Sequence, residues 1–407
     1  TFWHAMGGTN GEVLQQIVDD FNASQDEIEI KAEYQGTYDD TITKLKAAMQ
    51  SDSGLPDVCQ MYDVGTKFMY DSGAVIPVED KFESTGYDKS SVMDVISSYY
   101  TVDGKQYAMP FNVSTPMLYY NKDVFEAAGL DPETPPTTYD EVLEDAKKIV
   151  ESGAAPVGYS QAIYGWFFEQ QLAGLGVTYG NNDNGRKEAV TAVDFDSNGG
   201  GLKVFDMWKK LYDSGYFEDY GTTTADTQTA FFSGQVGMII ESTAILKNAV
   251  DSSPFEVGTG YLPRIEQNDE GGVIIGGGSL WLTDTGNEAN EDAAWKFIEY
   301  ITTPDVQAKW SMGTGYFAIN EKAYETEDMK AYLKENPNFE TAINQLKDSP
   351  VNCNTAGVLS GVQTEARLTF NEIMPQVYDG KLTTQDAVDQ LAASVNKAIE
   401  NYNESIK

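Results

Sequence analysis

The first 65 residues alternate between strand patterns and helix patterns, and this alternation limits the fold more than any other feature. Residues 1–6, 28–34 and 56–62 are predicted to be strands, and apolar residues at helical spacing fill 11–24 and 39–51 between them. Strand, helix, strand, helix, strand is typical of a parallel sheet with crossover helices. We therefore predict an α/β fold.

Helix signals continue further along the chain. Thr138 and Glu141 have the spacing of a capping box, an apolar stripe follows them, and Gly153 stands where that helix should end. A last helix is predicted from about Thr384. With 407 residues, the chain is too long for one ordinary core, so we expect about two domains.

The net charge of −37 excludes some partners. Without a basic stripe the chain is not expected to bind nucleic acid or anionic lipid. A small anionic ligand is not excluded. Salt screens charges over about 8 Å, so the electrostatic potential in a cleft depends mainly on the few charged residues that line it. No run approaches the ~20 apolar residues of a membrane span. The chain starts within a strand pattern, so any targeting segment is expected to have been removed.

Few residues could form a catalytic or metal centre. There is one histidine, His4, and there are two cysteines, Cys59 and Cys353. This argues against Ser/His/Asp, Cys/His and His-rich zinc sites, whereas a disulfide between the cysteines stays open. With 64 acidic residues, no carboxylate pair stands out as general acid and base. We predict no enzyme activity and no cofactor.

One segment has half of a calcium-binding pattern. "DFDSNGGG" offers Asp194, Asp196 and Asn198, but Phe205 occupies the twelfth position, where an EF-hand loop needs glutamate. We interpret it as a solvated turn.

The segment "IIGGGSLWL" (274–282) contains three successive glycines. It has neither the lysine of a Walker loop nor the spacing of a dinucleotide-binding fingerprint. It predicts either a plain β-bulge or a strand that a ligand or another backbone approaches closely.

Several segments resemble the extracellular solute-binding proteins of ABC importers. The similarity runs essentially end to end, and six segments are similar to the subfamily that binds glycerol-3-phosphate and glycerophosphodiesters. These segments are "FWHAMGG" (2–8), "YQGTYDD" (34–40), "MYDVGTKFM" (61–69), "PFNVSTPMLYYNKD" (110–123), "IIGGGSLWL" (274–282) and "TGYFAINEKAY" (314–324).

The resemblance implies a two-lobed, periplasmic-binding-protein-like fold of the class II type, with a ligand cleft between the lobes and hinge strands. The lobes would comprise residues 1–112 plus 266–312 and residues 113–265 plus 313–407, with crossings near 112–116, 262–272 and 312–316. It also implies a monomer outside the cell or in the periplasm, free or lipid-anchored, that delivers its ligand to membrane permease subunits.

The resemblance assigns ligand-binding roles position by position. A tyrosine would bind phosphoglycerol, an acid would bind the glycerol hydroxyls, and a tryptophan would stack against the glycerol side. Two serines, a backbone glycine, a second tyrosine and an arginine would hold the phosphate side. The matching residues are Tyr38, Asp63, Ser114, Trp166, Ser242, Gly277, Tyr316 and Arg367. A guanidinium that binds phosphate bidentately, with hydroxyls on the other oxygens, is chemically coherent.

Two positions depart from the subfamily pattern. Asp63 stands where the subfamily has glutamate, so its reach is shorter. Trp166 matches one of two expected tryptophans, but Ile163 replaces the other. This loss of a ring suggests room for a larger head group, and hence a glycerophosphodiester such as glycerophosphocholine rather than glycerol-3-phosphate.

Two rival functions stay open. The 24 tyrosines and 6 tryptophans would also suit an oligosaccharide ligand on the same fold. An enzyme such as a phosphodiesterase or glycosidase would instead show turnover.

Overall fold

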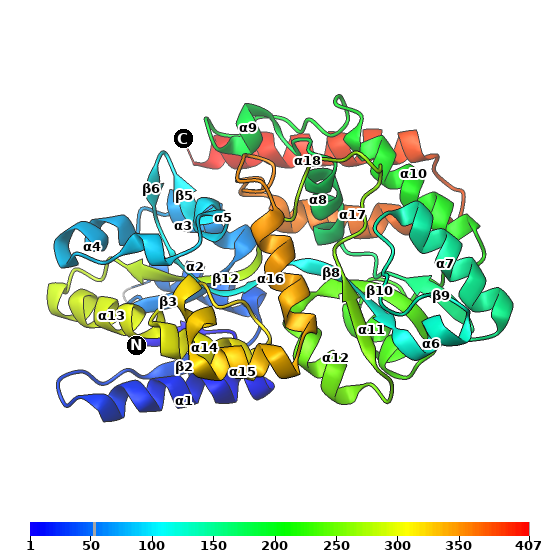
Figure 1. Ribbon diagram of the computed structural model, residues 1–407. Helices are drawn as coiled ribbons and strands as arrows, with labels where there is room; N and C mark the ends of the chain where they lie inside the picture. Colours follow the sequence, from blue (N-terminus) through cyan, green and yellow to red (C-terminus); the bar gives the residue numbers. More distant parts are fainter. Residues whose placement is uncertain (52–53, 407) are drawn as a thin grey trace. The chain divides into compact units, whose positions relative to one another are not determined.

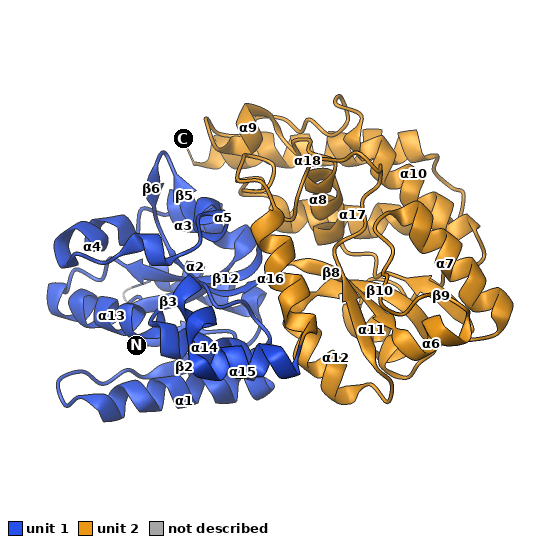
Figure 2. Cartoon of the chain, in the orientation of Figure 1, with its two compact units in different colours: residues 1–114, 275–336 blue, residues 115–274, 337–407 orange. Residues whose placement is uncertain are grey.

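The computed structural model describes residues 1–51 and 54–406. It divides into two compact units, coloured separately in Figure 2, and each is described here by itself. Unit 1 comprises residues 1–114 and 275–336, and unit 2 comprises residues 115–274 and 337–407. The α/β fold predicted from the sequence is confirmed.

Unit 1 is built on a mixed sheet in the order β2-β1-β3-β12-β4, with β7 also paired to β12. β1 pairs in parallel with both β2 and β3, as the opening alternation predicts, whereas β12 is antiparallel to its neighbours. The strands are β1 (Phe2–His4), β2 (Ala32–Tyr34), β3 (Val58–Tyr62), β4 (Val75–Ile76), β7 (Met109–Ser114) and β12 (Gly276–Thr283).

β2 is shorter than predicted, because residues 28–31 do not join the sheet. The side chain of Asn22 binds both backbone groups of Ile30: Oδ1 accepts from its N–H at 2.8 Å, and Nδ2 donates to its carbonyl at 2.9 Å. Those backbone groups are therefore not available to a neighbouring strand.

Helices cover the sheet of unit 1, and a two-stranded hairpin lies beside it (Figure 1). α1 buries the apolar stripe of Leu14, Ile17, Val18 and Phe21, which the helical spacing predicts. The remaining elements of unit 1 are α1 (Gly8–Ser24), α2 (Tyr38–Met49), η1 (Asp63–Gly65), α3 (Thr66–Asp71), α4 (Val78–Thr85), η2 (Lys89–Ser91), α5 (Asp94–Ser97), η3 (Ser98–Tyr100), β5 (Thr101–Val102), β6 (Lys105–Gln106), α13 (Glu288–Ile301), α14 (Pro304–Thr314), η5 (Glu321–Glu325) and α15 (Glu327–Glu335).

The crossings between the units differ in part from those predicted. The first follows Ser114, within the expected 112–116, but the second follows Ile274 rather than 265 and the third follows Asn336 rather than 312. Segment 313–336 stays with unit 1 for a packing reason: Ala318, Ala323 and Met329 form a small core with Ala308 of α14.

Unit 2 is built on a four-stranded sheet in the order β11-β8-β10-β9. Its strands are β8 (Pro116–Asn121), β9 (Val157–Ser160), β10 (Val236–Ser242) and β11 (Val257–Gly260), and its helical elements are α6 (Lys122–Ala127), α7 (Tyr139–Ser152), α8 (Gly165–Gly174), α9 (Asn181–Gly185), α10 (Gly200–Asp213), α11 (Thr224–Phe232), η4 (Thr243–Ile245), α12 (Leu246–Ser252), α16 (Asn338–Asp348), α17 (Gln363–Tyr378) and α18 (Thr384–Ser405).

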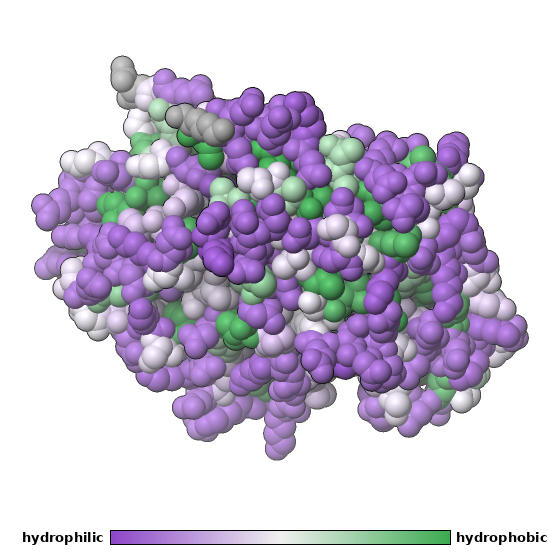
Figure 3. Space-filling view, turned by 90° about the horizontal axis from the view of Figure 1, so that it is seen from above, coloured by the Kyte–Doolittle hydropathy of each residue, from purple (hydrophilic) through white to green (hydrophobic). Residues whose placement is uncertain are grey.

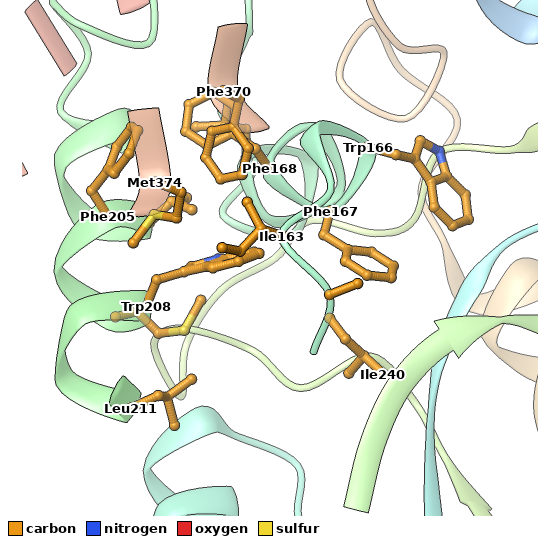
Figure 4. Packing of buried hydrophobic residues seen from close by; sticks show 14 of the residues in the cluster. Ile163, Trp166, Phe167, Phe168, Phe205, Trp208, Leu211, Ile240, Phe370 and Met374 are labelled. Atoms are coloured by element: carbon orange, nitrogen blue, oxygen red, sulfur yellow. The ribbon is translucent and has the colours of Figure 1, made fainter. Parts of the chain in front are cut away.

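The capping and C-terminal signals predicted for the helix after Thr138 are confirmed in unit 2. Thr138 caps α7 in a complete capping box with Glu141, and Gly153 ends it in the left-handed conformation at φ 75°. α8, α10, α17 and α18 pack together around one core (Figure 1). Figure 4 shows Ile163, Phe168, Trp208 and Phe370 converging in that core.

Both cysteines are free thiols, and burial raises the pKa of Cys59 to about 12. None of the helices in the described ranges combines the length and apolarity of a membrane span. On the face drawn in Figure 3, hydrophilic residues predominate and apolar ones form small separate groups.

Candidate functional site

In unit 1, the triple-glycine strand β12 lies unusually close to β7. Gly277 has a φ of +94°, and a Cβ at this position would be 1.8 Å from the carbonyl oxygen of Asn112. The register shifts between Gly278 and Ser279. Both sequence interpretations therefore apply: there is a bulge, and another backbone makes the close approach.

Asn112 is the polar centre of this region. It is fully buried, its Oδ1 accepts from Nε2 of Gln60 at 2.7 Å, and its Nδ2 donates to the hydroxyl oxygen of Tyr38 at 2.7 Å. Gln60 in turn accepts from the backbone N–H of Ala5 at 2.8 Å. This chain of hydrogen bonds fixes the Tyr38 hydroxyl relative to three strands.

Two of the predicted tyrosines lie together beside Asn112. Tyr38 and Tyr316 interact with each other and with Asn112. Tyr38 stacks on Tyr62 with ring centroids 5.2 Å apart, and Tyr316 stacks on Trp310 at 5.7 Å. Burial raises the pKa of both phenols, most strongly that of Tyr38, so both hydroxyls are neutral. A neutral phenol can donate a hydrogen bond to an oxygen-rich ligand.

Asp63 and Ser114 lie at the ends of two strands that pair with β12. Asp63 follows β3 directly, is 6% exposed, and is close enough to raise the pKa of Tyr38 further. Ser114 is the last residue of β7. Because side chains alternate along a strand, Ser114 and Asn112 point to the same face of the sheet. Five predicted residues thus belong to unit 1, including Ser114 and Tyr316, which were both expected in the other lobe.

In unit 2, Arg367 is not free to hold a phosphate in the expected way. It lies on α17, is 9% exposed, and binds Glu169 of α8 bidentately. Its Nε donates to Oε1 at 2.7 Å and its Nη2 to Oε2 at 2.8 Å, while Nε2 of Gln363 donates to Oε1 at 2.9 Å. The Nε and Nη2 edge of the guanidinium therefore already binds the carboxylate of Glu169, and the ion pair is electrically neutral.

Trp166 is near Arg367 through the contact between α8 and α17. A Cβ on the neighbouring Gly165 would be 2.5 Å from the Cα of Arg367. Trp166 is 5% exposed, and its Nε1 has no hydrogen-bond acceptor among the described residues. Figure 4 shows it directed away from Phe168, toward the opposite side of α8.

Ile163 does not enlarge a binding site. It is fully buried in the core of unit 2, against the side on which Trp208 and Phe168 lie (Figure 4). The absence of a second tryptophan here consequently gives no argument for a larger head group, and that sequence argument was wrong.

Ser242 ends β10 and is the N-cap residue of the short helix η4. Its Oγ accepts from the backbone N–H of Ala244 at 3.1 Å, so its hydroxyl proton is available to another acceptor. Its own N–H donates to Oε1 of the buried Glu241 at 2.7 Å, and the hydroxyl of Tyr119 donates to its carbonyl at 2.7 Å.

Sequence reasoning missed Asn112, Gln60 and Glu169. The first two carry a usable signal, because each is an amide within an otherwise apolar strand, where a buried polar side chain needs a partner. Glu169 carries no such signal, since nothing in the sequence distinguishes it from the other acidic residues.

The groups brought together here are phenols, hydroxyls, amides, the carboxylate of Asp63 and one neutralised ion pair, and such groups can form hydrogen bonds with a polar ligand. In residues 1–51 and 54–406 no cluster of three or more His, Cys, Asp or Glu could hold a metal ion. In the turn interpreted above as solvated, Asp194 accepts from the Thr178 hydroxyl and Asn198 from the N–H of Gly200.

Comparison with known proteins adds to this description. Residues 16–341 match the family model for bacterial extracellular solute-binding protein. The whole chain is 30% identical to the sn-glycerol-3-phosphate-binding periplasmic protein UgpB of Escherichia coli K12, covering 93% of that protein. It is also 30% identical over its whole length to UgpB of Pectobacterium atrosepticum, covering 92%.

Two solved structures are similar over nearly the whole length. UgpB from Mycobacterium tuberculosis, in complex with glycerophosphocholine, has a TM-score of 0.83 and 21% identity, over 99% of this chain and 98% of that one. The cyclic α-maltosyl-1,6-maltose binding protein from Arthrobacter globiformis has a TM-score of 0.81 and 26% identity, over 98% of each chain.

Proposed function

Since this chain belongs to the bacterial extracellular solute-binding proteins, which capture ligands for ABC importers, we propose that it captures a phosphoglycerol compound. The observation that carries the proposal is the 30% identity over the full length to a glycerol-3-phosphate-binding protein. Arg367 stands at the position that the resemblance assigns to the phosphate, and its guanidinium is buried in an ion pair with Glu169.

The ligand-binding residues in this proposal are those implied by the resemblance. Tyr38, Asp63, Ser114, Gly277 and Tyr316 act from unit 1, and Trp166, Ser242 and Arg367 act from unit 2. Asn112 and Glu169 join them as positioning residues, because each holds a predicted ligand-binding side chain by hydrogen bonds. The protein binds its ligand without turnover and hands it to membrane permease subunits.

The ion pair between Arg367 and Glu169 favours a phosphodiester over a phosphomonoester. Glu169 cancels the charge of the guanidinium and repels a second negative charge placed beside it. A glycerophosphodiester carries one negative charge, whereas glycerol-3-phosphate approaches two at neutral pH. We therefore propose a glycerophosphodiester such as glycerophosphocholine as the preferred ligand, now on the ground of charge.

Isothermal titration of the unfolded, ligand-stripped and refolded protein tests the proposal. The ligands are glycerophosphocholine, glycerol-3-phosphate and maltotriose, and phosphate release is followed in parallel. We expect binding without hydrolysis in the order diester, monoester, sugar. Tighter binding of the monoester would contradict the charge argument, and hydrolysis would contradict a pure binding role.

An oligosaccharide ligand is the second candidate, because a 26% identical structure is that of a maltosyl-maltose binding protein. Arg367→Ala separates the two: it should abolish binding of a phosphate ligand but leave sugar binding intact. Lys381→Ala is the control, since it removes an exposed cation just beyond the same helix. Circular dichroism verifies that both variants are folded.

A further inference from the structure

A cavity of about 520 Å³ lies within unit 2, lined by none of the residues assigned to ligand binding above. Its walls are the loop 135–137, the segment 259–273 and the face of α16, with Gln171 and Gly174 at the end of α8. A volume of this size is typical of sites for small molecules.

Hydrogen bonds hold the cavity walls in place. Gln345 of α16 is 5% exposed, accepts from the N–H of Leu262 at 2.5 Å and donates to the carbonyl of Pro116 at 2.7 Å. The hydroxyl of Ser349 accepts from the N–H of Val273 at 3.1 Å. The cavity is thus preformed and does not depend on a mobile loop.

The segment 259–273 also lies tightly against α8. A Cβ on Gly271 would be 1.9 Å from the carbonyl oxygen of Ala173, so only glycine permits this approach. The N–H of Gly271 donates to the carbonyl of Gly174 at 3.2 Å. This contact closes the cavity on the side of α8.

Arg264 gives the cavity an available positive charge. Its backbone is fixed, because its N–H donates to the carbonyl of Thr137 and its carbonyl accepts from the N–H of Tyr139, each at 2.9 Å. Its side chain is exposed and makes no ion pair or hydrogen bond with the described part of the chain, and Asp269 interacts with it only through space, without an ion-pair contact. The only other charged group of the lining, Asp348, accepts from the hydroxyl of Tyr261 at 2.7 Å.

An arginine side chain without an ion pair or hydrogen bond is unusual in a chain with 64 acidic and 27 basic residues. Around it the lining is largely apolar, with Pro135, Pro136, Leu262 and Val273. A molecule that fits both features has an apolar body and one anionic group.

We propose that this cavity is a second binding site, for a small amphipathic anion such as an aromatic carboxylate or sulfonate. Its anionic group binds the guanidinium of Arg264, and its apolar body contacts the prolines, Leu262 and Val273. The site is separate from the one for the transported ligand.

Occupation of the cavity is coupled to binding of the transported ligand. The segment 259–273 ends directly before the crossing at 274/275, α16 begins directly after the crossing at 336/337, and Gln345 binds the chain just after the crossing at 114/115. A molecule that fixes these segments changes the free energy of any motion at the crossings, and such coupling is reciprocal.

The test uses 8-anilinonaphthalene-1-sulfonate as the probe, with fluorescence and calorimetry on the full chain. We expect one site of micromolar affinity, and Arg264→Gln should weaken it about tenfold, whereas Arg264→Lys should retain part of the affinity. Gln267→Trp, which places a ring at the exposed edge of the cavity, should block the probe. Lys397→Gln removes an exposed cation of α18 outside the cavity and should have no effect.

A saturating amount of glycerophosphocholine separates this proposal from the proposed function. We expect glycerophosphocholine to change the affinity for the probe without displacing the probe. Because coupling is reciprocal, the probe should change the affinity for glycerophosphocholine by the same factor. If Arg264→Gln and Gln267→Trp bind the probe like the unmodified chain, or if glycerophosphocholine displaces it competitively, the second site is wrong. Failure of glycerophosphocholine to bind at all would contradict only the proposed transported ligand.

Discussion

Arg367 and Glu169 form a buried, bidentate ion pair, with Nε–Oε1 at 2.7 Å and Nη2–Oε2 at 2.8 Å. Both residues are less than 10% exposed. The pair joins α17 to α8, and under the proposed function it determines the charge that a ligand meets beside Trp166. Its removal should therefore affect both stability and ligand preference.

Glu169→Gln should destabilise unit 2 by about 3–5 kcal/mol, because it leaves a buried guanidinium without its counter-charge. Among the molecules that remain folded, preference should shift toward glycerol-3-phosphate. Urea unfolding and titration with both ligands measure the two effects. Asp213→Asn, which breaks the exposed pair with Lys209, should cost less than about 1 kcal/mol. An equal loss in the two variants would contradict the role given to burial.

Asn112→Ala should weaken ligand binding and lower the free energy of unfolding by about 1–3 kcal/mol, because Gln60 loses its buried acceptor. The hydroxyl of Tyr38 also loses its donor. Calorimetry and urea unfolding measure the two losses. Asn290→Ala is the control, since that exposed amide only donates to Asp57 at 3.2 Å. Unchanged affinity in Asn112→Ala would show that the Tyr38 position does not depend on this amide.

Gly277→Ala should destabilise unit 1 by more than about 2 kcal/mol, because a methyl group would overlap the Asn112 carbonyl in addition to the backbone strain. Gly286→Ala is a matched control: its φ is +69°, but a Cβ there would meet nothing within 4 Å. The control should therefore lose only the backbone contribution of about 1 kcal/mol. Thermal unfolding of both variants gives the comparison.

Glu241 and Glu141 should contribute to the pH dependence of stability with opposite signs. Burial raises the pKa of Glu241, so its contribution is fully present below the unfolded value near 4.5 and is lost as the pH rises through the folded value. Hydrogen bonds from Thr137 lower the pKa of Glu141, so its contribution is present above 4.5 and is lost as the pH falls through the folded value.

The test is urea unfolding of Glu241→Gln and Glu141→Gln between pH 3 and pH 8, each relative to the unmodified chain. The stability advantage of Glu241→Gln should increase from low to high pH, whereas the deficit of Glu141→Gln should shrink at low pH. The same slope in both variants would contradict these assignments.

The sequence predicts those parts of the structure that local chemistry determines. The capping box at Thr138, the apolar stripe of α1 and the parallel pairing of β1 follow from spacing alone. The length of β2 does not, because the side chain of Asn22 competes for its backbone. The third crossing was misplaced because alanines such as Ala318 and Ala323 give a weak apolar pattern even where they form a core.

Within the candidate site, the resemblance supplied residues but not their partners. Tyr38, Tyr316 and Asp63 do lie together, although their segments are distant in sequence. The partner of Arg367 was unpredictable, since Glu169 is 198 residues away and chemically identical to many other acids. Ile163 shows the converse: a departure from the subfamily pattern can lie in the core and have no bearing on the ligand.

The three crossings also fix the order in which the chain can fold during synthesis. The sheet of unit 1 has β12 between β3 and β4, so it is incomplete until residue 283 has left the ribosome, after the whole of 115–274. The core of unit 2 is incomplete until α17 and α18 have been synthesised, because these two helices supply much of it. Unit 1 therefore cannot complete its sheet, nor unit 2 its core, before most of the chain has been synthesised.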